Sequence, residues 1–297
     1  MKFSVICAVV CVLWISSSRY AEAEIFGDGD PDNGIEDSRQ LLAATDMAHY
    51  QRFFGTIECF GRVRGIALLL SVLNSESDKF HPVLLTAKHV FPGVGNERLE
   101  DCHYQAAGKP WQPQLLARKY VSGGSSRVGA EQSRVAEFAE DWTLVSMPTW
   151  KGWKNNAFSF SIDIAQRRYN GRGDKDTPYP QRAIFIGFDE ALGGFMVDFE
   201  CEFGFPEPES LAGSAPHLLW DNCDSVRGSS GGVVFGWIDH EPKIAGIRVG
   251  NLFDAGIYPY GPGPGDKFDL STNINLTRLL DQEILDAMEA LSISAPD

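Results

Sequence analysis

Short apolar segments recur along the sequence, and residues that favour turns separate them. Segments of this kind, bounded by Gly, Pro or Asn, are typical of β-strands. We expect strands at 65–73, 82–86, 115–121, 142–147, 183–187, 194–203, 233–238 and 243–249. The segment 276–291 differs, because its large apolar residues recur at helical spacing with acidic residues between them. The whole pattern predicts an all-β sandwich or barrel, with one C-terminal amphipathic α-helix docked on it.

The composition supports a large folded core and argues against nucleic-acid binding. The chain has 297 residues, of which 43% are hydrophobic and 22% are charged. That is enough for one large domain or for two small lobes. The formal net charge is −14, and no run of Lys and Arg offsets it. An acidic chain repels phosphate backbones, so we expect no nucleic-acid partner.

Residues 1–23 have the pattern of a secretory signal peptide. Lys2 precedes an apolar run of about 13 residues, which is short of the ~20 that a membrane anchor, the alternative interpretation, would need. Ala21-Glu22-Ala23 then matches a cleavage site of the A-x-A type. We expect a signal peptide at 1–23, an acidic exposed arm or propeptide at 24–47, and the folded domain at 48–297. The product is expected to be secreted, extracellular or periplasmic, with no membrane attachment after signal cleavage.

Export makes disulfide bonds available to the cysteines. Cys7 and Cys11 lie in the signal segment, which leaves four cysteines in the mature chain. Four cysteines allow three pairings, and the sequence alone does not choose between them. Their order along the chain favours Cys59 with Cys102 and Cys201 with Cys223. No cluster of His and Cys has the spacing of a zinc site, so no metal is expected.

The segment 227–232 (Arg-Gly-Ser-Ser-Gly-Gly) combines serines with closely spaced glycines, directly before the apolar segment 233–238. Glycines let the backbone turn so tightly that successive amides point to one place, beside the hydroxyl of Ser230. A nucleophile next to an oxyanion hole has this arrangement. A glycine-rich hairpin loop has the same composition, so this segment alone leaves both interpretations open.

Two further residues could complete a catalytic group. His89 follows the apolar segment 82–86, and a histidine on a rigid element could act as general base for a serine. Asp141 directly precedes the segment 142–147, where a carboxylate could orient an imidazole. Taken singly, the histidine could be a surface residue and the aspartate a turn or cap residue. The two together with Ser230, all at strand ends, favour a catalytic triad.

These three motifs, T-A-x-H, D-x-x-L and G-x-S-G-G in this order, resemble the chymotrypsin/trypsin-like serine peptidases over residues 53–292. The resemblance implies two antiparallel six-stranded β-barrels with the triad between them and a C-terminal helix. It implies that His89 is the general base, that Asp141 orients it and that Ser230 is the nucleophile. The amides of Gly228 and Ser230 would form the oxyanion hole. The pair Cys223-Asp224 is similar to a secreted, bacterial-type branch near the glutamyl endopeptidases.

The sequence departs from this family beside two of the motifs. Ser229 stands where animal digestive members have an aspartate that pairs with a newly cut N-terminus. A hydroxyl cannot hold a buried ammonium as an ion pair, so activation by that route is not expected. Lys88 stands beside His89 in place of a small residue. We expect its ammonium to point to solvent.

Substrate-binding residues are assigned by the same resemblance. Asp224, with Ser225 beside it, lies where trypsins select basic side chains, and Arg248 lies where glutamyl endopeptidases place a histidine. Opposite charges in one small pocket are expected to pair, leaving neither free to select a charged side chain. There are two alternatives: Arg248 selects acidic side chains of the substrate, or Asp224 selects basic ones. Gly250 should keep the pocket open, while the backbone of 249–251 pairs with an extended substrate.

Together these features predict a secreted serine endopeptidase that acts on proteins or peptides as a monomer, without cofactor. A non-catalytic binding protein on the same fold is the rival interpretation, although such homologues normally lose a triad member. An esterase of the α/β-hydrolase type conflicts with the order His, Asp, Ser. Asn275-Leu276-Thr277 is a sequon for N-glycosylation in a eukaryotic secretory pathway.

Overall fold

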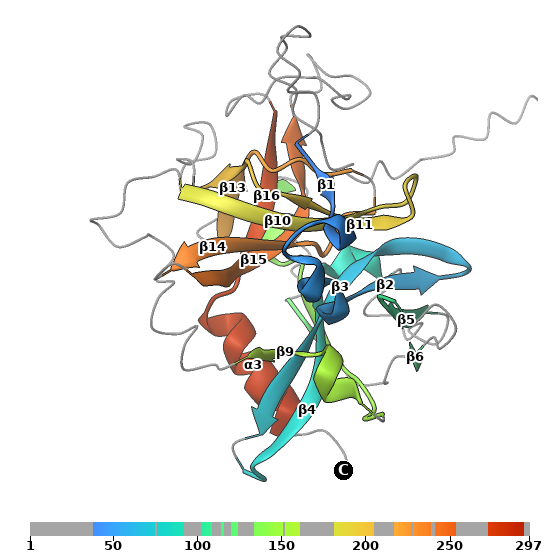
Figure 1. Cartoon of the computed structure of the whole chain (residues 1–297). Coiled ribbons are helices and arrows are strands. Elements are labelled where there is room, and N and C mark those ends of the chain that lie inside the picture. The colour runs from blue at the N-terminus through green and yellow to red at the C-terminus, as the bar shows by residue number, and fades with distance from the viewer. Residues whose placement is uncertain are drawn as a thin grey trace, which may run out of the picture.

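The computed structural model describes most of the predicted domain (Figure 1). The described residues are 38–74, 76–91, 102–108, 114–115, 120–123, 134–150, 152–160, 181–204, 217–226, 228–238, 241–253 and 273–293. They form mostly β-structure in two sheets, with a C-terminal helix. The expected signal peptide at 1–23 and the first part of the expected arm, 24–37, lie outside the described residues.

One sheet closes into a six-stranded antiparallel barrel, here called the closed barrel. Going round it, each strand pairs with the next in the order β10, β12, β13, β16, β15 and β14, and β14 pairs with β10 again. The strands are β10 (Gln181–Asp189), β12 (Glu202–Phe203), β13 (Leu218–Asp221), β14 (Val233–Ile238), β15 (Glu241–Phe253) and β16 (Asn273–Leu279).

Two further strands extend the closed barrel along β10. β11 (Gly194–Asp198) pairs with β10, and the short β1 (Gln40–Leu41) pairs with β11. Two 3-10 helices, η1 (Leu42–Ala44) and η2 (Ala48–Phe53), follow β1. Leu42 and Met47 are buried in the core. The stretch 38–47 therefore docks on the folded domain, whereas we expected it to be part of an exposed arm or propeptide.

The second sheet does not close within the described residues and is here called the open sheet. Its strands follow the order β6, β5, β2, β3, β4, β8 and β7, and β9 pairs with β3 from the side. In Figure 1 its blue and green strands lie beside the yellow to red closed barrel. The strands are β2 (Phe54–Cys59), β3 (Arg62–Asn74), β4 (Lys79–Thr86), β5 (Cys102–Ala106), β6 (Gln114–Leu115), β7 (Tyr120–Ser122), β8 (Thr143–Ser146) and β9 (Phe158–Phe160).

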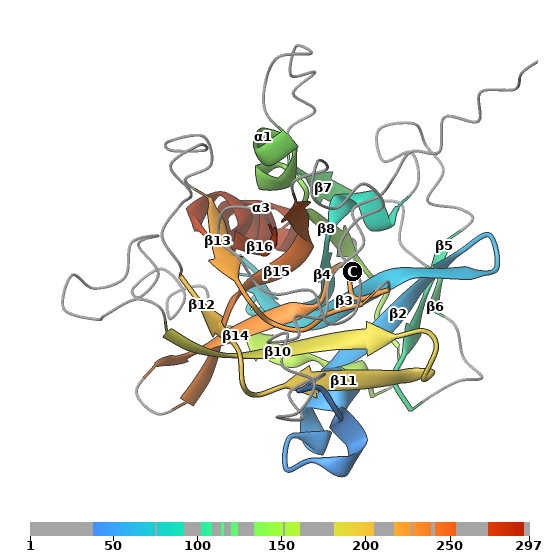
Figure 2. The ribbon, with the colours of Figure 1, turned by 90° about the horizontal axis from the view of Figure 1, so that it is seen from above.

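The C-terminal helix is shorter than the sequence pattern predicts. Residues 276–279, at the start of the predicted helix, belong to β16, and α3 spans Gln282–Ile293. It leaves the closed barrel and packs on β3, β4 and β8 of the open sheet. The short helix α1 (Arg134–Ala139) lies on the same side of the molecule, as Figure 2 shows. Two other 3-10 turns, η3 (Lys88–Val90) and η5 (Trp153–Asn156), belong to the open sheet's half.

Most of the predicted strands are present, and the strand predicted at 233–238 has those bounds. The segment 194–203 contains two strands, β11 and β12, with a break between them. Of the segment 115–121, only its ends lie in described strands, β6 and β7. Six strands were not predicted from the sequence: β1, β2, β5, β9, β13 and β16.

Both predicted disulfide pairs form, one in each sheet. Cys59 is bonded to Cys102 across the pairing of β2 with β5, and Cys201 is bonded to Cys223 beside the closed barrel's interior. Disulfides are typical of proteins from oxidising compartments, so the pairs fit the expected export. Within the described part of the chain, no helix combines the length and apolar character needed to cross a membrane.

Candidate active site

His89 is placed by the end of β4. The strand runs through Thr86, and the chain then turns into η3, which carries His89 toward the closed barrel. The Thr86 hydroxyl donates to the Ile66 carbonyl at 2.6 Å, which ties the strand end to β3. Lys88 does not point freely to solvent as expected, because its ammonium donates to the Gly123 carbonyl at 3.0 Å. Both contacts hold the segment that leads into His89.

Asp141 lies between α1 and β8 and contacts His89 twice. Its Oδ2 is 2.5 Å from His89 Nδ1, and its Oδ1 accepts the backbone N–H of His89 at 2.9 Å. The Asp141 side chain is 11% exposed, so little water competes for these bonds. A carboxylate held in this way fixes the imidazole tautomer with the proton on Nδ1, which leaves Nε2 as an acceptor.

Ser230 comes from the other sheet, in the turn 228–232 that precedes β14; we call these residues the nucleophile turn. Ser230 Oγ is 2.8 Å from His89 Nε2. The Ser230 carbonyl accepts the Ile66 N–H of β3 at 2.9 Å, so the two sheets meet directly at this residue. Gly231 has φ +81°, and a Cβ there would lie 2.1 Å from the Ile66 carbonyl oxygen. Only glycine fits this approach between the two sheets.

Within the described part of the chain, three of the five amides of the nucleophile turn donate hydrogen bonds. Ser229 N–H donates to the Val226 carbonyl, Gly231 N–H to Arg248 and Gly232 N–H to Ser229. Among the hydrogen bonds of the described residues, none involves the N–H of Gly228 or of Ser230. These are the two amides predicted to form the oxyanion hole.

Ser229 stabilises the turn from the barrel side. Its hydroxyl donates to the Phe188 carbonyl on β10 at 3.0 Å, and its side chain is buried. A Cβ at Gly187 would lie 2.7 Å from Ser229 Oγ, so the serine is closely packed against β10. The residue before the predicted nucleophile is thus held by a neutral hydrogen bond rather than by an ion pair.

The pKa of His89 is raised above its ordinary value. Burial acts to lower it, but the charge of Asp141 and the hydrogen bond to Asp141 together outweigh burial, and Arg64 opposes them weakly. A raised pKa means that the imidazolium is stabilised by the carboxylate. That is the property required of a base that must hold a proton transiently.

Asp224 is bound by the segment before β1, which the sequence did not connect to it. Its Oδ2 accepts the backbone N–H of Ser38 at 3.0 Å and lies 2.9 Å from the Ser38 hydroxyl. The same hydroxyl is 2.7 Å from Asp198, whose pKa is raised by burial. Asp224 and the neighbouring Ser225 are both buried. In the chain as it stands, Asp224 holds Ser38 in place.

Arg248 is completely buried and pairs with Asp221. Its Nη2 is 2.6 Å from Asp221 Oδ1 and 3.3 Å from the Cys223 carbonyl, and its guanidinium lies 4.7 Å above the Phe185 ring. We expected an ion pair of Arg248 with Asp224, but the carboxylate at hydrogen-bond distance is that of Asp221. The prediction failed because Arg248 points into the closed barrel, and no local pattern marked Asp221 as facing the same interior.

Gly250 lies where β15 passes close to α1. A Cβ at this position would lie 2.4 Å from Phe138 Cε1, so a side chain here would collide with α1. The ladder between β14 and β15 ends at the pair Val233 and Ile247, with Arg248 bonded to Gly231 and Gly232 just beyond it. The backbone of 249–251 continues past that ladder, on the side nearest Ser230.

Two other predicted features have structural outcomes. Asn275 is fully buried, and its Nδ2 donates to the Cys223 carbonyl at 2.8 Å, so the sequon is not accessible in the folded chain. Asp198, Cys201 and Cys223 come close enough to suggest a metal site. The two sulfur atoms are bonded to each other, however, so no thiolate ligand is present there.

Residues that support the site from a distance, namely Ser38, Asp221 and Phe138, were not predicted from the sequence, and Thr86 was noted only as part of the T-A-x-H motif. Each is an ordinary polar or aromatic residue in its local sequence, so only the fold reveals it.

A scan against protein-family models found no match to this sequence, and a search of curated proteins found no similar sequence. A closed six-stranded antiparallel barrel beside a second, mainly antiparallel sheet is consistent with a trypsin-like fold.

Proposed function

We propose that the chain is a secreted serine endopeptidase of the trypsin-like type, with two barrel lobes. The observation that supports this most directly is the chain of contacts Asp141–His89–Ser230, at 2.5 Å and 2.8 Å. A serine, an imidazole and a buried carboxylate in this order are the groups that acyl transfer requires.

In the proposed reaction, Ser230 Oγ attacks the carbonyl carbon of a peptide bond while His89 Nε2 takes its proton. The oxyanion that forms is bound by the N–H groups of Gly228 and Ser230, which no other group of the described residues uses. His89 then gives the proton to the leaving amine, which leaves an acyl-enzyme on Ser230. Water, deprotonated by His89, releases the acyl group and restores the serine.

The substrate would bind as an extended strand along 249–251, beyond the end of the β14–β15 ladder. Both charged side chains that were expected to select the substrate are already bonded within the chain. Arg248 is paired with Asp221, and Asp224 accepts a hydrogen bond from Ser38. We therefore infer that charge selection at the cleavage site is weak. No cofactor takes part in this scheme.

Labelling with a fluorophosphonate probe tests the proposal directly. The wild-type chain is expected to be labelled, and Ser230→Ala to lose all labelling while remaining folded. His89→Ala should slow labelling by several orders of magnitude, because the hydroxyl loses its base. Ser229→Ala is the matched control: it removes the adjacent hydroxyl and its bond to Phe188, and should retain labelling, although at a lower rate. A folded wild-type chain that is never labelled would favour the rival interpretation, a non-catalytic binding protein.

A further inference from the structure

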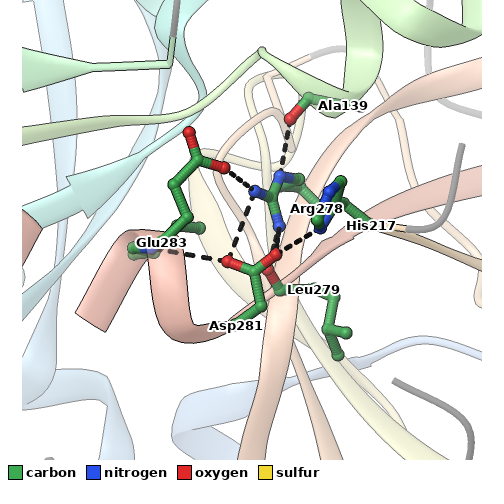
Figure 3. Close-up of polar contacts among 7 residues, drawn as sticks. Ala139, His217, Arg278, Leu279, Asp281 and Glu283 are labelled. Carbon is green, nitrogen blue, oxygen red and sulfur yellow. Dashed lines mark hydrogen bonds and ion pairs between the residues drawn. The ribbon is translucent and has the colours of Figure 1, made fainter. Parts of the chain in front are cut away.

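Arg278 connects the segment where β16 passes into α3 with the end of α1 (Figure 3). It is the penultimate residue of β16, and its side chain is completely buried. Its Nε donates to the Ala139 carbonyl at 2.6 Å, and Nη1 donates to the Leu279 carbonyl at 2.6 Å. Both Nη atoms contact Asp281, at 2.9 Å and 3.4 Å, and Nη2 is 2.8 Å from Glu283. These five contacts match the five N–H groups of a guanidinium.

Asp281 links the Arg278 side chain to the start of α3. Its Oδ1 is 3.4 Å from the Ile284 N–H, which places it as the cap of the helix. Its Oδ2 is 2.5 Å from His217 Nδ1, and the Leu279 N–H donates to the His217 carbonyl. Four of the five arginine contacts therefore anchor the guanidinium to the segment where β16 passes into α3.

The fifth contact reaches the backbone that carries the triad carboxylate. Ala139 is the last residue of α1, and its carbonyl is one of those that a helix end leaves without a partner. Asp141, two residues further, donates its own N–H to Phe138. A side chain at Gly250 would collide with Phe138, so α1 lies close to β15, and its last residue is also bonded to Arg278.

We propose that Arg278 is a positioning residue for the triad, and that it acts by fixing the backbone between α1 and Asp141. The Asp141 carboxylate orients His89 through two hydrogen bonds, so its placement depends on that backbone. Arginine suits the role because its planar fork reaches two carbonyls and two carboxylates at once, whereas a lysine ammonium cannot. This inference rests on the proposed function.

The test compares Arg278→Lys with Glu283→Gln in the full chain. For each variant, urea unfolding gives the stability, and the pH dependence of fluorophosphonate labelling gives a plateau rate and a midpoint. In Arg278→Lys we expect labelling to slow by roughly 10- to 100-fold, as for a small misplacement of a catalytic group. We also expect the midpoint to move to lower pH, because a displaced Asp141 no longer raises the pKa of His89 as strongly.

Glu283→Gln is the matched control, because Glu283 contacts the same guanidinium but belongs to α3 and not to the backbone between α1 and Asp141. It should leave both the rate and the midpoint unchanged, even where it lowers stability. A folded Arg278→Lys with the wild-type rate and midpoint would overturn the proposal, because a merely structural role changes stability alone.

Two further measurements keep the test decisive. If Arg278→Lys does not fold, Asp281→Ser retains a helix cap but removes two arginine contacts, and should shift the midpoint in the same direction by less. An unchanged midpoint in this variant would also contradict the proposal. The proton resonance of His89 Nδ1, followed by NMR, reports the Asp141 contact without any activity. If the wild type is not labelled, the proposed function fails, while a resonance unchanged in Arg278→Lys separately refutes the positioning role.

Discussion

Arg248 and Arg278 lie at neighbouring positions of one β-ladder but have opposite surroundings. Arg248 pairs with Thr277 across the strands, and Arg278 pairs with Ile247. Because successive side chains alternate between the faces of a strand, the two arginines point to opposite sides of the sheet. Both are fully buried. Arg248 points into the closed barrel, and Arg278 points out toward α1 and α3.

The two guanidinium groups differ in how completely they are bonded. All five N–H groups of Arg278 bond to carbonyls or carboxylates, and the two carboxylates, of Asp281 and Glu283, are partly exposed to water. Among the described residues, the Nε and Nη1 atoms of Arg248 have no hydrogen-bond partner, and its ion pair with Asp221 is closed off from solvent. Burial lowers the pKa of Arg248, against the charges of Asp221, Asp198 and Asp224. A buried charge is therefore bonded more fully where loops and helix ends supply acceptors than inside a barrel of regular strands.

The largest effect on stability is expected when the ion pair of Arg248 with Asp221, inside the closed barrel, is broken. Arg248→Met should lower the free energy of unfolding by about 3–5 kcal/mol, because Asp221 would remain buried without its partner. Urea denaturation of the purified variant measures this loss. The double variant Arg248→Met, Asp221→Asn should recover a large part of it, since no unpaired charge remains. Equal losses in the single and double variants would contradict this explanation.

The equivalent change on the outer face should have a smaller effect on stability. In Arg278→Met, the carboxylates of Asp281 and Glu283 can be hydrated, because their side chains are 13% and 48% exposed. The remaining cost is the loss of donors for the Ala139 and Leu279 carbonyls, which is roughly 1–3 kcal/mol. Unfolding of both methionine variants under the same conditions tests the ranking, and a larger loss for Arg278→Met would reverse the comparison.

The smallest effect on stability is expected from loss of the contact between His89 and Asp141, because this contact is partly open to solvent. The pKa of His89 is raised in the folded state, so the interaction stabilises the fold fully below the ordinary value of 6.5. That stabilisation is lost as the pH rises through the folded pKa. Unfolding measured at several pH values should therefore show a wild-type advantage over Asp141→Asn that shrinks toward alkaline pH. An advantage that grows with pH would contradict the raised pKa.

The positions of the proposed triad could be predicted because each one has a local signature. Glycines surround Ser230, and apolar strands adjoin His89 and Asp141, so short stretches of sequence carry the information. The pairing of the cysteines followed simply from their order.

The bonding of the charged residues could not be predicted, because their partners are distant in the sequence. Arg248 was recognised as important, but Asp221 could not be assigned to it before the closed barrel was known. The boundary of the C-terminal helix was wrong for a related reason. β16 is buried on both faces, with Asn275 and Thr277 inside the barrel and Leu276 outside, so its apolar residues imitate the spacing of a helix.

The direct bond between the Ser230 carbonyl and the Ile66 amide has a consequence for biosynthesis. His89 and Asp141 belong to one half of the molecule and Ser230 to the other, so a nascent or half-folded chain has no complete triad. On the proposed function, proteolytic capacity arises only when the two halves have docked. On that function, the cell that makes the protein would be protected from its activity during synthesis, even without an inhibitor or a propeptide.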